Sequence, residues 1–372
     1  MTAIIVILII FAFLYLIIAL VTISGIAKKT AQHNKNTPFV SVILAAKDEE
    51  GNIQNCLNSL KNINYPPAKI EYLLVNDRSQ DKTRFYMKQF SDQMDNVKIL
   101  DIENLPNNRT GKINALIKGA NAAQGEVLIF TDADCEVPGN WVKSFINHID
   151  SDTGMLCGFL VLDKKNKTTP LWHYLQTIDW IYITSIGYGW TKLGRPLSIF
   201  GNNFAIKKDI YEECDGFESV KDHITEDYAL MENVLARTNA KVNFILDPEN
   251  VVYTNPVNTL SAFFSQRKRW AVGCLKRKFL SILLPLTSVL LRLLIIIALF
   301  SQIFMLGLTA MLFIIFLDTA ILFHPLKKLH RLNLLKYIFL FEIYVTIYQI
   351  FFTPLALFAK KIIWKSDKYS IY

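Results

Sequence analysis

The stretch that decides the fold is Val127-Leu-Ile-Phe-Thr-Asp-Ala-Asp134, an apolar run that ends in two aspartates separated by one residue. A short continuous apolar run is typical of a strand buried on both faces of a parallel sheet. The segment before it, Lys112 to Ala123, has the apolar spacing of a helix. A helix followed by such a strand indicates part of an α/β unit.

Similar apolar runs lie upstream at 39–46, 70–75 and 97–102, and residues 52–60 between the first two have helical spacing. This alternation predicts a Rossmann-like α/β domain with a parallel sheet. In such sheets ligands bind beyond the carboxyl ends of the strands. Polar clusters follow three of the runs: Lys47-Asp48-Glu49, Asp77, and Asp132 with Asp134.

The paired aspartates are the first chemical signal. A single aspartate after a strand usually caps a helix. Asp132 and Asp134 are separated by one residue, so both carboxylates can converge on one hard cation from an extended turn. Mg²⁺ and Mn²⁺ prefer oxygen ligands and share their remaining positions with water and phosphates. The pair therefore predicts a site for one of these two cations.

Two further motifs lie downstream. Residues 199–205 have the pattern of a strand, and a helix is expected from Thr225 to about Thr238, with Glu226 and Asp227 in its first turn. Acidic residues there also suit the helix dipole, so they have a structural explanation as well. The motif Gln266-Arg-Lys-Arg-Trp270 follows; its structural alternative is a membrane-surface helix with an interfacial tryptophan.

Composition indicates a membrane protein with a globular part. Hydrophobic residues make up 52% of the 372 residues and charged residues only 19%, which is too apolar for a wholly soluble chain. From Thr30 to Ser265 there are 23 basic and 29 acidic side chains, a net charge of −6, whereas Arg267 to Lys278 carries six basic ones and no acidic one. Basic charge beside apolar segments favours an anionic membrane surface as partner and argues against nucleic acid.

Three apolar segments are long enough to cross a membrane. Thr2 to Ala27 has no charge, and the two lysines after it place the following body in the cytoplasm. The segment 282–323 fits a two-span hairpin, and 337–358 would be a further span. An interfacial helix ending at Arg292, followed by a single span, is the alternative, and it would reverse the orientation of the segments that follow.

Taken together, the motifs resemble those of the family 2 glycosyltransferases, in the membrane-embedded branch that includes cellulose, chitin and hyaluronan synthases and ceramide glucosyltransferase. The matching residues are Asp77 in VNDRS, Asp132 and Asp134 in TDAD, Glu226 and Asp227 in TEDYAL, and Gln266, Arg269 and Trp270 in QRKRW. They occur in the family's order across about 60% of the chain. The resemblance implies a GT-A fold, a nucleotide-sugar donor, Mg²⁺ or Mn²⁺, and inversion at the anomeric carbon.

The resemblance also implies a role for each residue. Donor binding falls to Glu49, Asp77, Lys112 and Asp132, metal binding to Asp134, base catalysis to Asp227, and the acceptor and diphosphate side to Glu226, Gln266, Arg269 and Trp270. The chain departs from the family at Lys47-Asp48-Glu49, where an aromatic-Asn-Glu sequence is usual, so Glu49 matches the family's base-binding acid less closely than Asp77 does.

On this basis we divide the chain into five parts. They are an N-terminal transmembrane anchor (1–27), a cytoplasmic GT-A catalytic domain (38–265), a basic interfacial helix (266–281), about three C-terminal transmembrane helices (282–359) and a basic tail (360–372). We expect a multi-pass protein of the cell membrane.

The expected function is transfer of a sugar from a nucleotide sugar, with uridine the expected base, to a lipid or lipid-linked acceptor. A processive polysaccharide synthase is the first alternative, although three or four membrane helices are few for a polymer channel. The second alternative is a catalytically silent membrane scaffold that binds a nucleotide sugar.

Overall fold

The computed structural model describes residues 1–28, 36–104, 111–162, 170–220, 225–275, 279–357, 361–364 and 367–370. These residues form two compact units. The sheet unit contains Lys29–Lys164 and Ser198–Asn255, and the helical unit contains Met1–Lys28, Lys165–Leu197 and Pro256–Tyr372. The chain therefore leaves the sheet unit after Lys164, returns to it at Ser198 and leaves it again after Asn255.

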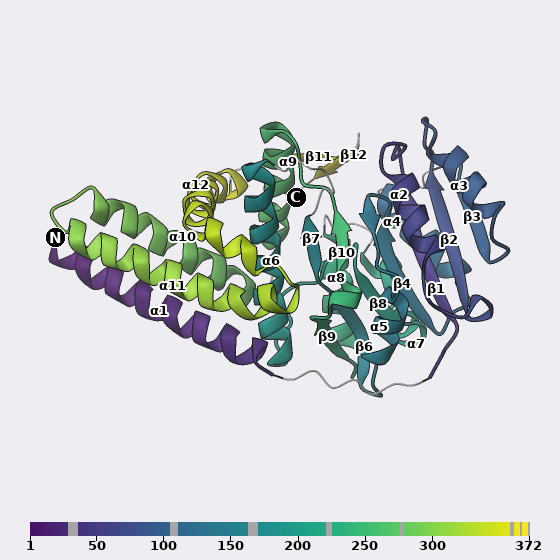
Figure 1. The fold of residues 1–372 in the computed structure, drawn as a ribbon, viewed down its shortest axis with the longest axis horizontal. Helices are drawn as coiled ribbons and strands as arrows, with labels where there is room; N and C mark the ends of the chain where they lie inside the picture. Colours follow the sequence, from purple (N-terminus) through teal and green to yellow (C-terminus); the bar gives the residue numbers. More distant parts are fainter. Residues whose placement is uncertain are drawn as a thin grey trace. The chain divides into compact units, whose positions relative to one another are not determined.

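The sheet unit is built on a mixed sheet with the strand order β3-β2-β1-β4-β8-β6-β9 (Figure 1). The strands are β1 (Val40–Ala46), β2 (Ile70–Asp77), β3 (Val97–Ile102), β4 (Val127–Asp132), β6 (Thr153–Gly158), β8 (Phe204–Lys207) and β9 (Lys241–Ile245). The strands predicted at 39–46, 70–75, 97–102 and 127–130 are confirmed within two residues at each end. The strand predicted at 199–205 is wrong for residues 199–203, because the chain turns through residues 201–203 and β8 runs from Phe204 to Lys207.

The sheet directions bring the polar clusters to one edge. β1 pairs in parallel with both β2 and β4, whereas β8 runs antiparallel to β4 and to β6. Ala45 stands beside Asp132 and Ala46 beside Asn76 in the register. The strand order reverses between β1 and β4, and the carboxyl ends flanking such a reversal are where ligands bind in α/β sheets.

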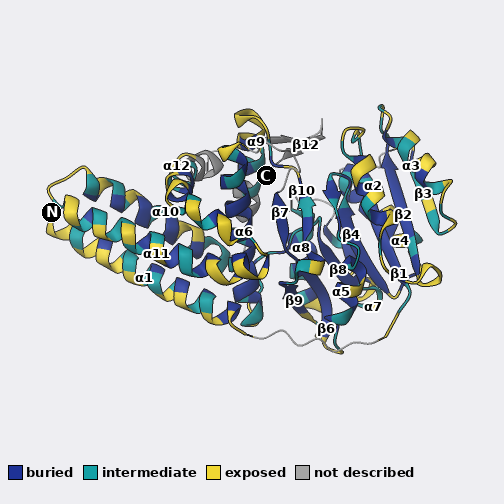
Figure 2. Ribbon diagram, in the orientation of Figure 1, coloured by how far each residue is buried: buried dark blue, intermediate teal, exposed yellow. Residues whose placement is uncertain are grey.

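Helices pack against the sheet, and their apolar side chains form the hydrophobic core together with those of the strands. These helices are α2 (Ile53–Lys61), α3 (Thr83–Ser91), α4 (Gly111–Ala122), α5 (Trp141–Asn147), α7 (Lys208–Glu213) and α8 (Glu226–Arg237). The sheet unit also contains a smaller sheet, made of β5 (Cys135–Glu136), β7 (Leu160–Leu162) and β10 (Val252–Thr254). Central strands are buried along most of their length (Figure 2). Ala115 of α4 packs on Val75 and Ile102, so burial fixes α4 against the same strands whose ends carry the polar clusters.

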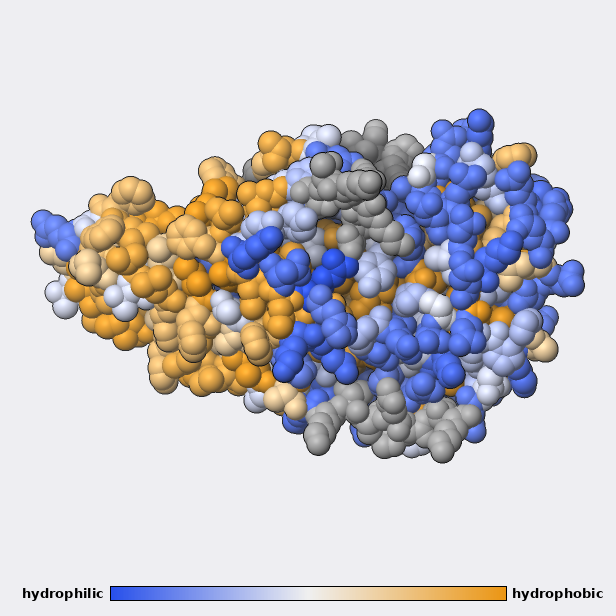
Figure 3. Space-filling model, viewed as in Figure 1, coloured by the Kyte–Doolittle hydropathy of each residue, from blue (hydrophilic) through white to orange (hydrophobic). Residues whose placement is uncertain are grey.

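The helical unit contains the apolar segments. Its helices are α1 (Thr2–Ile26), α6 (Leu171–Lys192), α9 (Leu260–Leu275), α10 (Phe279–Leu299), α11 (Phe304–Lys328) and α12 (Ile338–Leu357). In the part of the chain that the structure describes, four stretches are long and apolar enough to cross a membrane: α1, α10, α11 and Leu332–Phe351. Hydrophobic side chains cover the visible face of the helices (Figure 3). Exposed hydrophobic side chains of these helices include Ile10, Phe13 and Phe316. This agrees with one N-terminal and three C-terminal apolar helices.

Helix α6 differs from the expected division of the chain. The sequence places 38–265 in one domain, whereas the structure groups α6 and everything from Pro256 onward with the apolar helices. Close packing on α1 explains this, since a Cβ on Gly25 would lie only 1.9 Å from the carbonyl oxygen of Gly189. In addition, the indole of Trp190 donates to Thr22 Oγ1 at 2.9 Å.

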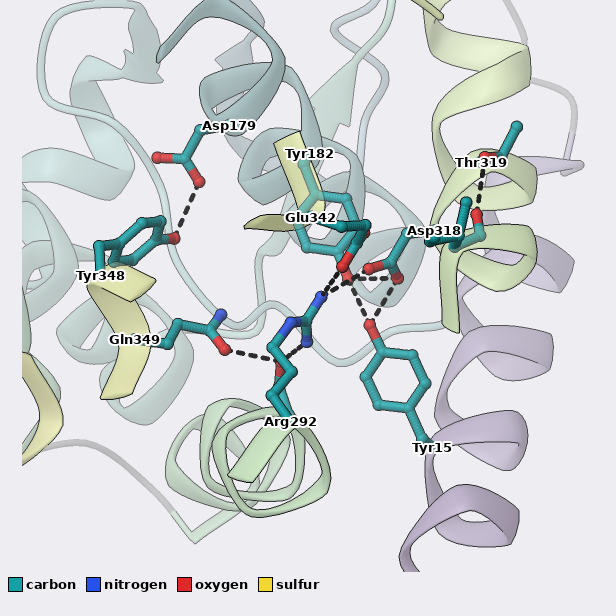
Figure 4. A network of polar contacts seen from close by, with 11 residues as sticks. Tyr15, Asp179, Tyr182, Arg292, Asp318, Thr319, Glu342, Tyr348 and Gln349 are labelled. Carbon is teal, nitrogen blue, oxygen red and sulfur yellow. Dashed lines mark hydrogen bonds and ion pairs between the residues drawn. The ribbon is translucent and has the colours of Figure 1, made fainter. Parts of the chain in front are cut away.

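Charges that look isolated in the apolar segments are paired in the structure. Arg292 of α10 binds Asp318 of α11 at 2.8 Å and Glu342 of α12 at 2.9 Å (Figure 4). The hydroxyls of Tyr15 and Tyr182 donate to Asp318 at 2.5 and 2.9 Å. Arg292 therefore lies inside a continuous helix and does not end an interfacial one, which removes the reason for the single-span alternative.

Candidate functional site

Asp77 ends β2 in a closely fitted setting. Its side chain is buried, and Arg78 Nε donates to one carboxylate oxygen at 2.8 Å. Gly111, the first residue of α4, faces the other oxygen: a Cβ there would lie 2.1 Å from Asp77 Oδ2. A side chain at position 111 would displace this carboxylate, so glycine lets α4 start directly beside the end of β2.

The loop after β1 is tied to the loop after β2. The backbone N–H of Gln80 donates to Asp48 Oδ1 at 2.8 Å, and that of Glu49 donates to Thr83 Oγ1 at 2.7 Å. The Glu49 side chain accepts from Asn52 at 2.9 Å. Asp48 adopts a left-handed backbone conformation with φ of 51°, which is uncommon for residues with a side chain. These contacts bring Glu49 and Asp77 to one edge of the sheet.

Lys112 joins three elements. Its ammonium group lies 3.1 Å from Asp132, at the end of β4, and 3.2 Å from Glu226, at the start of α8. All three side chains are partly exposed, so the contacts are open to exchange with a ligand. Lys112 also lies in the first turn of α4, where the helix dipole adds positive potential. This part of the site is suited to an anionic group.

Asp134 lies where negative charge is concentrated. Burial, together with the negative charges of Asp132 and Glu49, raises the pKa of its carboxyl group to about 6. Cys135 Sγ donates to Asp134 at 3.4 Å. Crowded carboxylates whose charge is incompletely compensated attract a cation.

This donor set fits a divalent cation that is held jointly with other ligands. Among the described residues, no group of three or more His, Cys, Asp or Glu side chains could hold a metal ion by itself. Asp132 and Asp134 supply the carboxylate oxygens that Mg²⁺ and Mn²⁺ prefer, and such ions usually keep waters or bind substrate phosphates. The chemistry of these two residues is therefore compatible with a metal completed by a phosphate ligand.

Asp227 is oriented by the backbone. Its Oδ2 accepts from the N–H of Gly201 at 2.8 Å, and its Oδ1 accepts from the N–H of Tyr228 at 2.8 Å. The approach of Gly201 is close, because a Cβ on it would lie 3.3 Å from the Cβ of Asp227. Asp227 thus connects the first turn of α8 to residues 200–203, which goes beyond the helix-capping explanation of this acid.

Asn203 supports that arrangement, and the sequence analysis missed it. The side chain is fully buried and donates to the carbonyl oxygens of Phe159 and Asn250, both at 2.9 Å. The indole of Trp141 donates to its Oδ1 at 2.9 Å. These bonds fix the turn that carries Gly201. The signal was present as Asn202-Asn203, two amides inside an otherwise apolar run.

The QRKRW motif lies in α9 of the helical unit. Gln266, Arg269 and Trp270 are half-buried, whereas Arg267, which the sequence analysis did not select, is buried and pairs with Asp179 of α6. The guanidinium of Arg267 lies 4.3 Å from the centroid of the Trp270 ring. The structure thus brings together the expected residues Glu49, Asp77, Lys112, Asp132, Asp134, Glu226 and Asp227 in the sheet unit, and the other three belong to the helical unit.

Comparison with known proteins agrees with this arrangement. Residues 41–214 match the family described as Glycosyl transferase family 2, a range that includes Asp77, Asp132 and Asp134. A probable glycosyltransferase, YdaM, of Bacillus subtilis is 28% identical over 249 residues, covering 66% of this chain and 57% of that protein. A beta-monoglucosyldiacylglycerol synthase of Trichormus variabilis is 26% identical over 242 residues, covering 64% and 50%. The chain spans about half the length of the curated relatives it matches.

The fold is also found in a solved structure. Mannosyltransferase PcManGT from Pyrobaculum calidifontis, determined in complex with GDP-Man and Mn²⁺, superposes with a TM-score of 0.59 at 16% identity, over 93% of this chain and 98% of that one. At this identity the likeness concerns the fold, and it confirms the expected GT-A architecture. In sequence, residues 41–214 of this chain are similar to glycosyl transferase family 2.

Proposed function

We propose that this protein is a membrane-bound inverting glycosyltransferase that moves a sugar from a nucleotide sugar to a lipid or lipid-linked acceptor. The observation that carries the proposal is the cluster around Lys112, where Asp132 and Glu226 meet at the carboxyl end of the sheet. Lys112 and Asp132 lie inside the range that matches family 2. Lys112 supplies a cation that can bind phosphate, and the carboxylates beside it can contribute to a metal site. A nucleoside diphosphate needs both.

Donor binding is assigned to the loops after β1, β2 and β4. Asp77 and Glu49 accept hydrogen bonds from the nucleoside, and Lys112 binds the diphosphate once it is released from Asp132 and Glu226. Asp134, with Asp132, would hold Mg²⁺ or Mn²⁺, and when bound the ion neutralises charge on the leaving diphosphate. The net charge of −6 from Thr30 to Ser265 makes such compensation necessary for an anionic donor.

Asp227 is the proposed catalytic base. The hydrogen bonds from Gly201 and Tyr228 fix the carboxylate before substrate binds, so little reorganisation is needed. Removal of the acceptor hydroxyl's proton by a positioned base typically contributes ~10²–10⁴-fold to the rate. A single displacement of this kind inverts the configuration at the anomeric carbon.

The lipid acceptor is favoured by the helices and by one relative. Four stretches of the described chain could cross a membrane, and the Trichormus variabilis relative is a beta-monoglucosyldiacylglycerol synthase. We place the sheet unit in the cytoplasm of a multi-pass cell-membrane protein, because two lysines follow α1. Gln266, Arg269 and Trp270 would then serve the acceptor and diphosphate side, next to the basic segment that favours anionic lipid.

Transfer by membranes that contain the protein tests the proposal. The donors are radiolabelled UDP-glucose, UDP-galactose, UDP-N-acetylglucosamine and GDP-mannose with Mn²⁺ or Mg²⁺, and the products are divided by solvent extraction. Asp227→Asn is the inactive variant, and Asp95→Asn, an exposed aspartate after α3, is the matched control.

We expect label in the organic phase with wild type and Asp95→Asn but not with Asp227→Asn. Label in a high-mass aqueous polymer would instead establish a polysaccharide synthase. Donor binding without transfer to any product would identify a silent scaffold.

A further inference from the structure

Helix α9 has two different faces. One face carries residues at spacings of four and three: Phe263, Arg267 and Trp270. This face is packed, because Phe263 and Arg267 are buried. Gln266 and Arg269 are three residues apart on the neighbouring face, and both are half-buried. Gln266 and Arg269, two of the residues proposed for the acceptor and diphosphate side, therefore lie beside the packed face of this helix.

The anchor is an ion pair enclosed by aromatic rings. Arg267 donates to Asp179 of α6, whose other oxygen accepts from the hydroxyl of Tyr348 of α12 at 2.9 Å (Figure 4). The guanidinium also lies 4.9 Å from the ring centroid of Phe263 and 5.2 Å from that of Tyr348. Such a planar cation, paired and stacked, fixes both the position and the rotation of its helix.

Helix α6 also holds the segment that leads into α9. The side-chain amide of Gln176 donates to the carbonyl oxygen of Val257 at 3.0 Å and accepts from its N–H at 3.1 Å. The indole of Trp172 donates to the same carbonyl at 3.1 Å. Thus α6 fixes the chain before α9 at Val257 and α9 itself at Arg267.

We infer that Arg267, through Asp179, is a positioning residue that sets the placement of Gln266 and Arg269 during sugar transfer. This inference rests on the proposed function. Neither Arg267 nor Asp179 touches the reacting groups in this scheme. Their contribution is to restrict α9, and a displacement of about 1 Å at a catalytic group can reduce the rate on the order of 10²-fold.

The helical unit contains a closely matched control. Asp318 is fully buried like Asp179, pairs with an arginine, and accepts from two tyrosine hydroxyls. It binds Arg292 of α10, however, and not α9. Asp318→Asn therefore makes the same chemical change in the same kind of setting while leaving the Arg267 contact in place.

The experiment compares Asp179→Asn and Asp318→Asn in the full-length protein in lipid nanodiscs. A nitroxide on Ser265→Cys, an exposed position of α9, reports helix mobility in a Cys274→Ser background; Cys56, Cys135, Cys157 and Cys214 are buried. Transfer kinetics are measured with the donor of the above panel that wild type uses. A double-mutant cycle combines each variant with Arg269→Ala.

We expect Asp179→Asn to raise spin-label mobility and to lower kcat/KM on the order of 10²-fold. In the Arg269→Ala background, the same substitution should cause no additional loss of kcat/KM. Asp318→Asn should leave mobility and kcat/KM at wild-type values. Unchanged mobility in Asp179→Asn, or losses that multiply with Arg269→Ala, would overturn the inference. If wild type transfers no sugar, the proposed function fails, and the mobility comparison alone decides whether Arg267 positions α9.

Discussion

Carboxylates are held in opposite ways in the two units. In the sheet unit, Asp132 and Glu226 share Lys112, and all three are partly exposed. In the helical unit, Asp179 and Asp318 are fully buried, and each pairs with a buried arginine. Partly compensated, accessible carboxylates remain available to a metal or a substrate, whereas paired and enclosed ones hold helices together. For these four residues, the setting and not the residue type separates the proposed site carboxylates from the architectural ones.

The largest effect on turnover should come from Asp227 in the sheet unit. Asp227→Asn keeps the shape of the side chain and, because an amide has a single acceptor oxygen, one of the two backbone contacts. It removes the basic carboxylate, so we expect kcat to fall by ~10²–10⁴-fold. Donor affinity, measured by equilibrium binding of the nucleotide sugar, should change less than threefold. An activity close to that of Asp95→Asn would exclude Asp227 as the base.

The largest effect on stability should come from the helical unit. Arg292→Met leaves Asp318 and Glu342 buried without their shared cation, and removal of one partner from a buried pair costs about 3–5 kcal/mol. The thermal unfolding midpoint in detergent should fall strongly. The control is Arg237→Met, which breaks an exposed pair with Asp215 and should cost less than about 1 kcal/mol. Equal losses in both variants would contradict the contrast between the units.

The sequence predicts one of these settings better than the other. Asp77, Asp132 and Asp134 directly follow apolar strands, and strand direction alone carries their side chains to one edge of the sheet. The partners of Arg292 lie 26 and 50 residues further along the chain, on other helices. No local pattern contains such a pairing, which depends on how the helices pack.

The same reasoning explains the residues that were missed. Arg267 and Asp179 are 88 positions apart, and Asp179 sits in a helix that the sequence assigned to the other domain. Gly201 contacts Asp227 across 26 positions through a backbone N–H, a group that every residue except proline has. Local motifs therefore predict which side chains do chemistry more readily than which groups hold them in place.

Asp134 tests whether removing a carboxylate from the sheet unit increases stability, in contrast to breaking an ion pair in the helical unit. Asp134→Asn removes one of several crowded negative charges, so the metal-free protein should become more stable by about 0.5–2 kcal/mol. The same variant should lose transfer at every Mn²⁺ concentration. Thermal unfolding in EDTA and transfer over a Mn²⁺ titration measure the two effects. A loss of stability in EDTA would show that Asp134 is an architectural residue like Asp318.

The smallest effect is expected at Thr225, which occupies the N-cap position of α8. An N-cap threonine usually stabilises its helix by about 1 kcal/mol through a side-chain hydrogen bond. Within the described residues the Thr225 side chain makes no such bond, while the neighbouring Asp227 accepts from Gly201 and Tyr228. Thr225→Ala should therefore change the free energy of unfolding by less than about 0.5 kcal/mol and leave kcat unchanged. A loss near 1 kcal/mol with normal kcat would mean that α8 is capped in the ordinary way. The orientation of Asp227 would still depend on its contacts with Gly201 and Tyr228, and Asn203→Ala, which loosens the turn that carries Gly201, would become the more informative variant.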